Sequence, residues 1–303
     1  MKGDGTPHGW LIVDKPLGLS SHRVVEIVRR RTAGKVGHAG TLDPLATGVL
    51  PIAIGEATKT TAYAMAGRKR YRFRIRWGVA RATDDCEGEL IGECSERPSR
   101  AAIEAVLPRF VGTIQQHPPI YSAIRVDGHR AYRLARRDRP ATPPARPVEI
   151  AELRLIGIPD RDYADCEALV GKGTYIRALA RDLGTALGTF AHIAQLRRLS
   201  VGRFTESQAV ALDFVAEAAH ITADWKHLLP IETALDGIPA LALTALEAAR
   251  LSRGQRVMPG DGGPWSYPGF QEGAIVGAWH GQAVIALARI EDGRLRPVRV
   301  INR

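Results

Sequence analysis

The sequence predicts an α+β protein with a large mixed, mainly antiparallel sheet, flanking helices and a small C-terminal module rich in β-strands. Segments with strand and helix periodicity follow one another without the regular βαβ alternation of a parallel sheet. Residues 69–79 (KRYRFRIRWGV) alternate between apolar and arginine side chains, as in a strand with one buried face. Around residues 235–239 the pattern changes to a short helix and short strands, which predicts two domains, 1–236 and 237–303.

Size and composition are those of an ordinary globular protein. The chain has 303 residues, enough to bury a large core, and 45% of them are hydrophobic. No apolar run is long enough to span a membrane, and the N-terminus lacks the apolar core of a signal peptide. The three cysteines form no CxxC pair, and the nine histidines show no metal-binding spacing. We expect a cytoplasmic protein with no membrane partner and no metal.

The first 110 residues contain three predicted strands and two predicted helices. Periodicity and end signals predict strands over 9–15, within 37–59 and over 69–79, and helices over 22–31 and 99–110. Pro16 ends the first strand, and Ser20 or Ser21 caps the helix that follows. That helix should stop at Gly34.

The chain continues with a proline-rich segment and a basic helix. Within residues 118–137 we expect a short strand, an Asp127–Gly128 turn and the basic helix, followed by a loop over 139–147. Further elements are strands over 148–158, 163–170 and 196–204, a helix within 171–188 capped at Thr174, a helix within 243–257, and strands within 272–281 and 283–301.

The segment GHAGTLDPLATGVLPIAIGEATK, residues 37–59, surrounds one carboxylate, Asp43, with glycines and prolines. It could be a structural turn, a phosphate loop or a platform for a nucleophile. The spacing of a phosphate loop is absent. An aspartate before a proline is usually a turn or cap residue, but the glycines and Pro44 could also hold a reactive carboxylate at a fixed angle. The other acid, Glu56, is expected to be a solvated residue at the end of a strand.

Charge indicates a polyanionic partner. There are 42 lysines and arginines against 32 aspartates and glutamates, a net charge of +10. Nucleic acid is the commonest partner of such a protein, although a generally basic proteome would give the same balance. The arginine side of residues 69–79 could be a solvated outer face of the sheet or a surface that meets phosphate groups.

Five segments carry a resemblance to a known family. They are residues 37–59, KRYRF at 69–73, HPPIYSAIRVDGHRAYRLAR at 117–136, GKGTYIRALARDLG at 171–184 and LRRLSVGRF at 196–204. In this order they resemble the TruB-type tRNA pseudouridine synthases, which make pseudouridine at position 55 in the T loop of tRNA. The resemblance implies a pseudouridine synthase fold over about two thirds of the chain. More weakly, the C-terminal module is similar to a PUA domain that binds RNA.

The resemblance also assigns the chemistry. Asp43 falls on the catalytic aspartate of the family, which acts on a uridine flipped out of the RNA and needs no cofactor. It acts either as a nucleophile or by removing a ribose proton. Arg177 matches the arginine that pairs with this acid, and a neighbouring guanidinium is known to keep a carboxyl group ionised.

The same resemblance implies a substrate-binding pocket around Asp43. Its members would stack on the flipped base, line the pocket or support the flipped nucleotide, and they are Tyr71, Tyr175, Leu196, His38 and, from its position near the site, Lys15. The implied partner is the T-arm stem-loop of tRNA, bound by a monomeric bacterial enzyme without guide RNA. Backbone contacts would come from the arginine-rich strand, residues 131–137 and the C-terminal module.

Two other functions stay open at this point. The chain could be an RNA-binding or RNA-folding module without catalysis, which would bind RNA equally well with its pocket blocked. It could also be a basic protein with no RNA partner, which would not prefer tRNA over random RNA.

Overall fold

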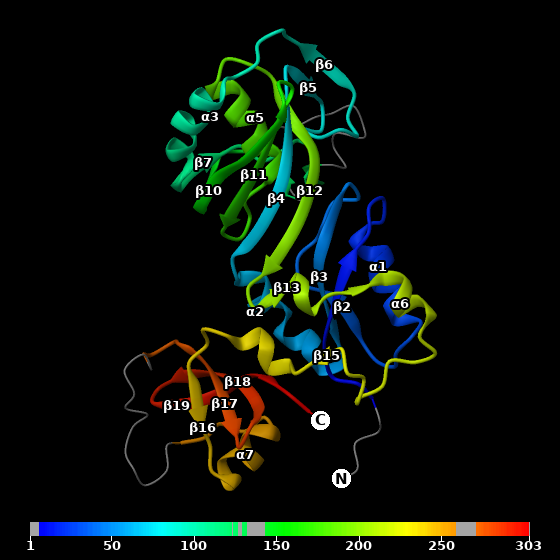
Figure 1. The fold of residues 1–303 in the computed structure, drawn as a ribbon. Helices are drawn as coiled ribbons and strands as arrows, with labels where there is room; N and C mark the ends of the chain where they lie inside the picture. Colours follow the sequence, from blue (N-terminus) through cyan, green and yellow to red (C-terminus); the bar gives the residue numbers. More distant parts are fainter. Residues whose placement is uncertain (1–5, 123, 127–128, 132–142, 259–270, 303) are drawn as a thin grey trace.

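The computed structural model describes residues 6–122, 124–126, 129–131, 143–258 and 271–302. They form an 11-stranded sheet, a four-stranded sheet near the C-terminus and two small two-stranded sheets. Figure 1 shows the large sheet running through the upper and middle parts of the molecule, with the four-stranded sheet at its lower end. Within the described residues, no helix is both long and apolar enough to cross a bilayer.

The main path of the large sheet has the strand order β14-β1-β3-β12-β4-β11-β10-β7. Its strands are β1 (Gly9–Lys15), β3 (Ala46–Ile54), β4 (Lys69–Trp77), β7 (Gly112–Gln116), β10 (Arg146–Asp160), β11 (Tyr163–Val170), β12 (Ala191–Val201) and β14 (Val210–Ala211). Three short strands pair beside this path: β2 (Val36–His38), β13 (Phe204–Thr205) and β15 (Leu228–Leu229). The two small sheets join β5 (Val79–Arg81) to β6 (Leu90–Glu93) and β8 (Arg125–Val126) to β9 (His129–Arg130).

Most neighbouring strands of the large sheet are antiparallel, as the sequence predicts. The parallel pairs are β1 with β14 and β3 with β12. The second pair joins the two halves of the sheet, because β3 belongs to the N-terminal part and β12 to the long strands at the other end. The α+β class with a mixed, mainly antiparallel sheet is confirmed.

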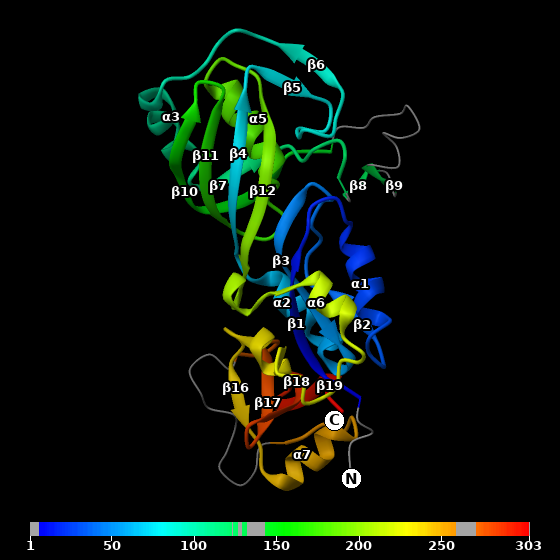
Figure 2. The ribbon, with the colours of Figure 1, turned by 45° about the vertical axis from the view of Figure 1, so that its right-hand side comes forward.

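Helices cover the sheet in two groups. They are α1 (Ser21–Arg29), α2 (Thr61–Ala66), α3 (Arg100–Val106), α5 (Ile176–Ala186) and α6 (Leu212–Glu217), with 3-10 turns η1 (Gly55–Thr60), η2 (Leu107–Phe110) and η3 (Glu206–Gln208). Figure 2 shows α5 and α3 against the strands β4, β10, β11 and β12, whereas α1 and α6 lie beside β1 and β2.

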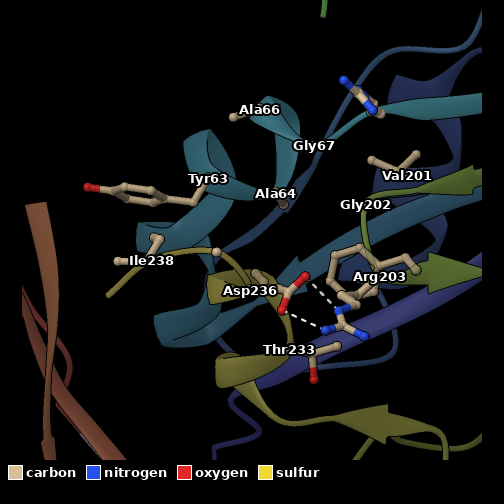
Figure 3. A pocket seen from close by; sticks show the side chains of 14 residues that line it. Tyr63, Ala64, Ala66, Gly67, Val201, Gly202, Arg203, Thr233, Asp236 and Ile238 are labelled. Carbon is tan, nitrogen blue, oxygen red and sulfur yellow. Dashed lines mark hydrogen bonds and ion pairs between the residues drawn. The ribbon is translucent and has the colours of Figure 1, made fainter. Parts of the chain in front are cut away.

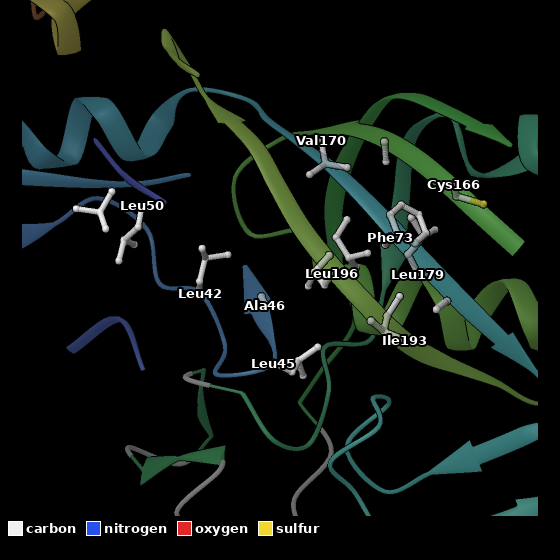
Figure 4. Packing of buried hydrophobic residues seen from close by; sticks show 14 of the residues in the cluster. Leu42, Leu45, Ala46, Leu50, Phe73, Cys166, Val170, Leu179, Ile193 and Leu196 are labelled. Carbon is white, nitrogen blue, oxygen red and sulfur yellow. The ribbon is translucent and has the colours of Figure 1, made fainter. Parts of the chain in front are cut away.

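The largest apolar cluster packs the helices α1, α3, α5 and α6 against the large sheet. It joins Leu179 of α5 to Phe73 of β4 and Leu196 of β12, and it also contains Leu42 and Leu45 from the loop after β2. Figure 4 shows these loop leucines beside the strand side chains. The loop that carries Asp43 is therefore fixed on both sides by residues of the core.

Three of the four arginines on the polar side of β4 are neutralised. They face acidic residues of the adjacent strand β11 and of β10, the strand beyond it, in the pairs Arg70–Glu152 (2.9 Å), Arg70–Glu167 (3.0 Å), Arg72–Glu167 (3.4 Å) and Arg74–Asp165 (2.6 Å). Ion pairs of this kind between strands stabilise the solvent-exposed face of a sheet. The structure thus favours the outer-face interpretation for these three arginines over a row of phosphate contacts.

The C-terminal part has its own sheet and helix. The sheet has the order β16-β17-β18-β19, and its elements are β16 (Ala240–Ala242), α7 (Ala245–Ser252), β17 (Ile275–His280), β18 (Ala283–Glu291) and β19 (Arg294–Val300). The segment η4 (Ile231–Leu235) precedes it. An apolar cluster crosses the junction, because Trp10 of β1 and Ile231 of η4 belong to the same cluster as Leu287 of β18.

A cavity of about 500 Å³ lies at this junction, between α2, the β12–β13 turn and η4. Figure 3 shows Tyr63 and Asp236 at its edge, with Asp236 joined to Arg203 by two contacts of 2.6 and 2.8 Å. Glu56 makes contacts at the same junction, so the expectation that it is a solvated residue at the end of a strand is wrong. Its carboxylate pairs with Lys59 at 2.6 Å and accepts the backbone N–H of Asn302 at 2.7 Å.

Several predicted boundaries shift. Helix α1 ends at Arg29, not near Gly34, although its cap is the predicted Ser20. Helix α5 begins after Tyr175, and Thr174 does not cap it: its hydroxyl instead donates to the carbonyl of Glu149 at 3.3 Å. The predicted strand over 196–204 is the end of β12, a turn and the start of β13. The Asp127–Gly128 turn and residues 132–137 of the basic helix lie outside the described residues.

Candidate active site

The loop between β2 and β3 carries Asp43 and is held by buried side chains. The backbone N–H of Ala46 donates to the carbonyl of Asp43 at 3.0 Å, which closes a tight turn over Pro44 and Leu45. Ser21, at the start of α1, donates to the carbonyl of Leu42 at 2.9 Å and accepts its N–H at 2.8 Å. The backbone on both sides of Asp43 is thus tied to the body of the protein.

Lys15, the last residue of β1, contacts the same loop. Its side chain is fully buried, and its ammonium donates to the carbonyls of Leu19 (2.6 Å), Pro16 (2.9 Å) and Pro44 (3.2 Å). Burial lowers the pKa of Lys15 to about 8, although the nearby Asp43 carboxylate opposes this shift. The three hydrogen bonds make Lys15 an anchor of the loop, and the substrate contact expected for it stays a prediction.

Arg198 on β12 is a second anchor, which the sequence analysis missed. It is 1% exposed, and its guanidinium donates to the carbonyls of Gly40 and Val49 at 2.9 and 2.8 Å. Gly48 has a φ of +100°, and a Cβ at this position would overlap the backbone of Arg198. Glycine is therefore required where β3 passes so close to β12.

Arg177, in the first turn of α5, lies beside Asp43. Its Nη2 is 2.9 Å from the Oδ2 of Asp43, and its Nη1 is 3.3 Å from the Oδ2 of Asp85. The guanidinium also donates to the carbonyls of Thr83 (2.9 Å) and Tyr121 (3.1 Å). The Arg177 side chain is 6% exposed, whereas that of Asp43 is 39% exposed. One buried cation therefore bridges a buried and an accessible carboxylate.

Asp85 is the partner that the sequence analysis did not find. It is 2% exposed, and it accepts the hydroxyl of Thr83 and the backbone N–H of Glu87, the latter at 3.1 Å. The only signal in the sequence is an acidic run, TDDCEG, in a loop that ends in glycine. Nothing in that pattern shows that one of these acids would be buried against residue 177, which lies far away along the chain.

The register of the sheet brings Tyr71 and Leu196 to the same place. Leu196 is opposite Ala46 in the parallel pair of β12 with β3, three residues after Asp43, and opposite Phe73 on β4. Tyr71 lies two residues before Phe73 on the same face of β4, and its half-buried ring packs against the apolar cluster. Both side chains thus belong to the sheet surface under the Asp43 loop.

Tyr175 is positioned by its backbone. Its N–H donates to the side-chain oxygen of Gln116 at 2.9 Å, and its carbonyl accepts from the Gln116 amide at 3.2 Å. The guanidinium of Arg146 lies 5.4 Å from the centre of its ring, within cation–π range. Since Tyr175 precedes Arg177 by two residues, the same helix start carries the aromatic ring and the cation.

His38 lies at the opposite end of the loop, on β2, where it pairs with Ile52 of β3. Burial lowers the pKa of His38, and the positive charges of Arg198 and His22 act in the same direction. The imidazole is therefore neutral at neutral pH. Its Nδ1 is buried, with no hydrogen-bond partner in the part of the chain that the structure describes.

The arrangement offers a carboxylate for nucleophilic or base chemistry. Asp43 is accessible, its loop is held by buried side chains, and the guanidinium of the buried Arg177 lies 2.9 Å from its Oδ2. Tyr71 and Leu196 provide a flat and an apolar surface nearby. Within the described residues, no group of three or more His, Cys, Asp or Glu side chains could hold a metal ion.

Comparison with known families identifies the group to which these residues belong. Residues 28–176 match the N-terminal domain of the TruB family pseudouridylate synthases, and residues 177–236 match the tRNA pseudouridylate synthase B C-terminal domain. The chain belongs to the TruB family. The matched regions contain Asp43, Tyr71, Arg177 and Leu196, and the family is one of pseudouridine-forming isomerases.

Bacterial relatives align along nearly the whole chain. The tRNA pseudouridine synthase B of Rhodospirillum rubrum is 48% identical over 297 residues, which cover 97% of this chain and 96% of that protein. The protein of the same name from Gluconacetobacter diazotrophicus is 50% identical, with 97% of each chain covered. That of Bradyrhizobium diazoefficiens is 48% identical and covers 97% of this chain and 86% of its own.

Solved structures support the fold. The archaeal box H/ACA sRNP Nop10-Cbf5 complex contains a chain that superposes with a TM-score of 0.73 at 22% identity, covering 98% of this chain and 87% of that chain. A chain of a Cbf5-Nop10-Gar1 complex gives a TM-score of 0.70 at 25% identity, covering 94% of this chain and 78% of that one. The likeness extends over the C-terminal sheet as well, which the sequence predicted as a separate module.

Proposed function

We propose that this protein converts uridine to pseudouridine at position 55 in the T loop of tRNA, with Asp43 as its catalytic residue. Membership of the TruB family and the names of the bacterial relatives support a tRNA substrate. The observation that carries the assignment to Asp43 is the contact with the buried Arg177 at 2.9 Å, made from a loop that is open to solvent. We further propose that the enzyme acts as a cytoplasmic monomer without guide RNA.

The reaction exchanges one glycosidic bond for another. The bond from C1′ of the ribose to N1 of uracil breaks, the base turns, and a bond from C1′ to C5 forms, while C5 loses a proton and N1 gains one. No electrons leave or enter the substrate, and no cofactor is needed. Asp43 starts the reaction as a nucleophile at the ribose or as a base that removes a ribose proton, and Arg177 holds its carboxylate in place through the contact at 2.9 Å.

The substrate base must leave the RNA stack to reach this carboxylate. Extrusion costs a few kcal/mol, and stacking of the base on an aromatic side chain recovers about 1–3 kcal/mol. Tyr71 supplies that ring, with Leu196 and Tyr175 as further walls of the pocket and His38 as support for the flipped nucleotide. Lys15 serves indirectly, because its ammonium fixes the carbonyl of Pro44 next to Asp43.

Residues 237–303 would form a PUA-like module that binds the RNA backbone, with residues 1–236 as the catalytic domain. The last two strands of its sheet expose four arginines: Arg289 on β18, and Arg294, Arg296 and Arg299 on the edge strand β19. Such contacts are sequence-independent and weaken as salt concentration rises.

The test is the Asp43→Asn variant on a T-arm stem-loop labelled with tritium at C5 of the target uridine. Pseudouridine formation releases the label, so we expect no release by the variant. Its affinity for the stem-loop should stay within about threefold of the wild type, because asparagine has the shape of aspartate and preserves the conformation of the loop. Asp213→Asn, an exposed aspartate on α6, is the matched control and should turn over normally.

The alternative functions give different results in the same experiment. If the protein were a non-catalytic RNA-binding module, the wild type would bind the stem-loop but release no tritium. A basic protein without an RNA partner would not distinguish the T arm from a random RNA of the same length. Full turnover by Asp43→Asn would remove Asp43 from the mechanism.

A further inference from the structure

A basic cavity lies on the face of the large sheet opposite to Asp43. Side chains alternate along β4, and Phe73 and Ile75 point into the core that also contains Leu42 and Leu45 beside Asp43. Arg74 and Arg76 therefore point to the other face, where they line a cavity of about 430 Å³. This volume is in the range of small-ligand sites.

The cavity contains arginines that have no acidic partner. Arg74 is neutralised by Asp165, with contacts of 2.6 and 2.8 Å. Arg76 and Arg81 form no ion pair within the described residues, and the Nε–H group of each is buried without a hydrogen-bond partner there. Buried polar groups are nearly always satisfied, so two such donors beside one cavity point to a missing acceptor.

The balance of charge specifies the missing acceptor. Apart from Arg74, which Asp165 neutralises, the charged groups that line the cavity are the guanidinium groups of Arg76 and Arg81 and the carboxylate of Asp160. The Asp160 carboxylate accepts the backbone N–H of Asp162 at 2.7 Å. Burial lowers the pKa of His192, another lining residue, so the imidazole adds no charge at neutral pH. A net charge near +1 suits a singly charged phosphodiester better than a phosphate dianion.

An aromatic surface completes the site. The guanidinium of Arg76 lies 5.8 Å from the centre of the Tyr163 ring, and Tyr163 also lines the cavity. Stacking on tyrosine and arginine planes is how proteins hold bases of single-stranded RNA, and forked arginines bind the adjoining phosphates. We propose that this cavity binds a phosphodiester of single-stranded RNA together with its neighbouring base, as a second RNA site behind the catalytic one.

Cys86 provides a reporter inside the cavity. It lines the wall, its residue is exposed, and it follows Asp85 directly in the chain. The other two cysteines are Cys94, which is half-buried, and Cys166, which is buried. Burial raises the pKa of the Cys86 thiol, as do the carboxylates of Asp85 and Glu87, so its alkylation must be compared at one fixed pH.

The experiment measures protection of Cys86 in a Cys94→Ser protein against the uncharged reagent N-ethylmaleimide. A hexauridylate should slow alkylation severalfold at saturation, at constant ionic strength. Replacing Arg76 and Arg81 together by glutamine should raise the half-protecting concentration about tenfold or more, since charge-assisted hydrogen bonds are lost. Arg109→Gln, an exposed arginine of η2 outside the C-terminal module, is the matched control and should change nothing.

Two further arms make the result decisive. Inorganic phosphate and uridine monophosphate test the dianion, and protection by either of them without protection by hexauridylate would overturn the assignment to an RNA strand. Ala194→Leu fills the cavity without removing charge and should also abolish protection. Absence of protection in the parent protein, or equal protection in the folded double-arginine variant, would overturn the proposal. The readout is independent of turnover and therefore of Asp43.

Discussion

Replacing Asp85 by asparagine tests whether the buried partner of Arg177 matters for the reaction. In the wild type, Arg177 lies between the Oδ2 atoms of Asp43 and Asp85, at 2.9 and 3.3 Å. The change removes the negative charge on the buried side but keeps the shape of the side chain. The guanidinium is then balanced by Asp43 alone, and its position is no longer fixed from both sides.

The expected loss of stability follows from these contacts. Breaking a buried ion pair costs about 3–5 kcal/mol. The loss here should be smaller, about 2–3 kcal/mol, because Arg177 keeps Asp43 and two carbonyl acceptors, and the asparagine oxygen can still accept the N–H of Glu87. If Arg177 moves, the Asp43 carboxylate that it contacts moves with it. A displacement of this carboxylate by a fraction of an ångström to one ångström lowers turnover by roughly 10- to 100-fold.

The assay combines single-turnover tritium release with urea unfolding. Asp84→Asn is the control, since Asp84 is the adjacent residue and its carboxylate pairs with Arg181 at 2.8 Å instead. We expect the Asp85 variant to bind the stem-loop normally and turn over slowly, and the Asp84 variant to turn over normally. A folded Asp85→Asn protein with wild-type turnover would refute the idea that this carboxylate positions Arg177.

Two further predictions concern the scaffold. Lys69 is buried, which lowers its pKa from 10.5 to about 8, so between these pH values the unfolded state binds the extra proton and stability rises with pH. The stability of wild type relative to Lys69→Met should therefore increase over this window by at most about 3 kcal/mol, and a constant difference in urea unfolding would contradict the shift. Gly48→Ala should destabilise the protein by about 2–4 kcal/mol through positive φ and overlap with Arg198, whereas Gly37→Ala, with open space around its Cβ, should unfold close to the wild type.

The sequence predicted the parts of the fold that depend on local patterns. The alternation over residues 69–79 specifies β4, and Ser20 caps α1 as expected. The charged face of β4 could not be interpreted from one strand, because its neutralising acids come from β10 and β11, more than 70 residues later. Whether these arginines are neutralised depends on which strands pair in the sheet, and strand pairing leaves no signal in the local sequence.

The same limit applies to the site. Asp43 stands out through the glycines and proline around it, and Arg177 was found by resemblance to a family motif. Asp85 and Arg198 act through contacts between distant segments, so neither has a recognisable pattern of its own. Lys15 was placed near the site by analogy with the family, and its contacts with three loop carbonyls have no signal in the sequence.

We propose that Asp43, held by Arg177, drives the isomerisation of one uridine in the T loop of tRNA. The most direct test of this proposal is to map pseudouridine at single-nucleotide resolution in an unmodified tRNA incubated with the wild type or with Asp43→Asn. We predict one new pseudouridine, at position 55, with the wild type and none with the variant. Modification elsewhere, none with the wild type, or an unchanged signal with the variant would contradict this account.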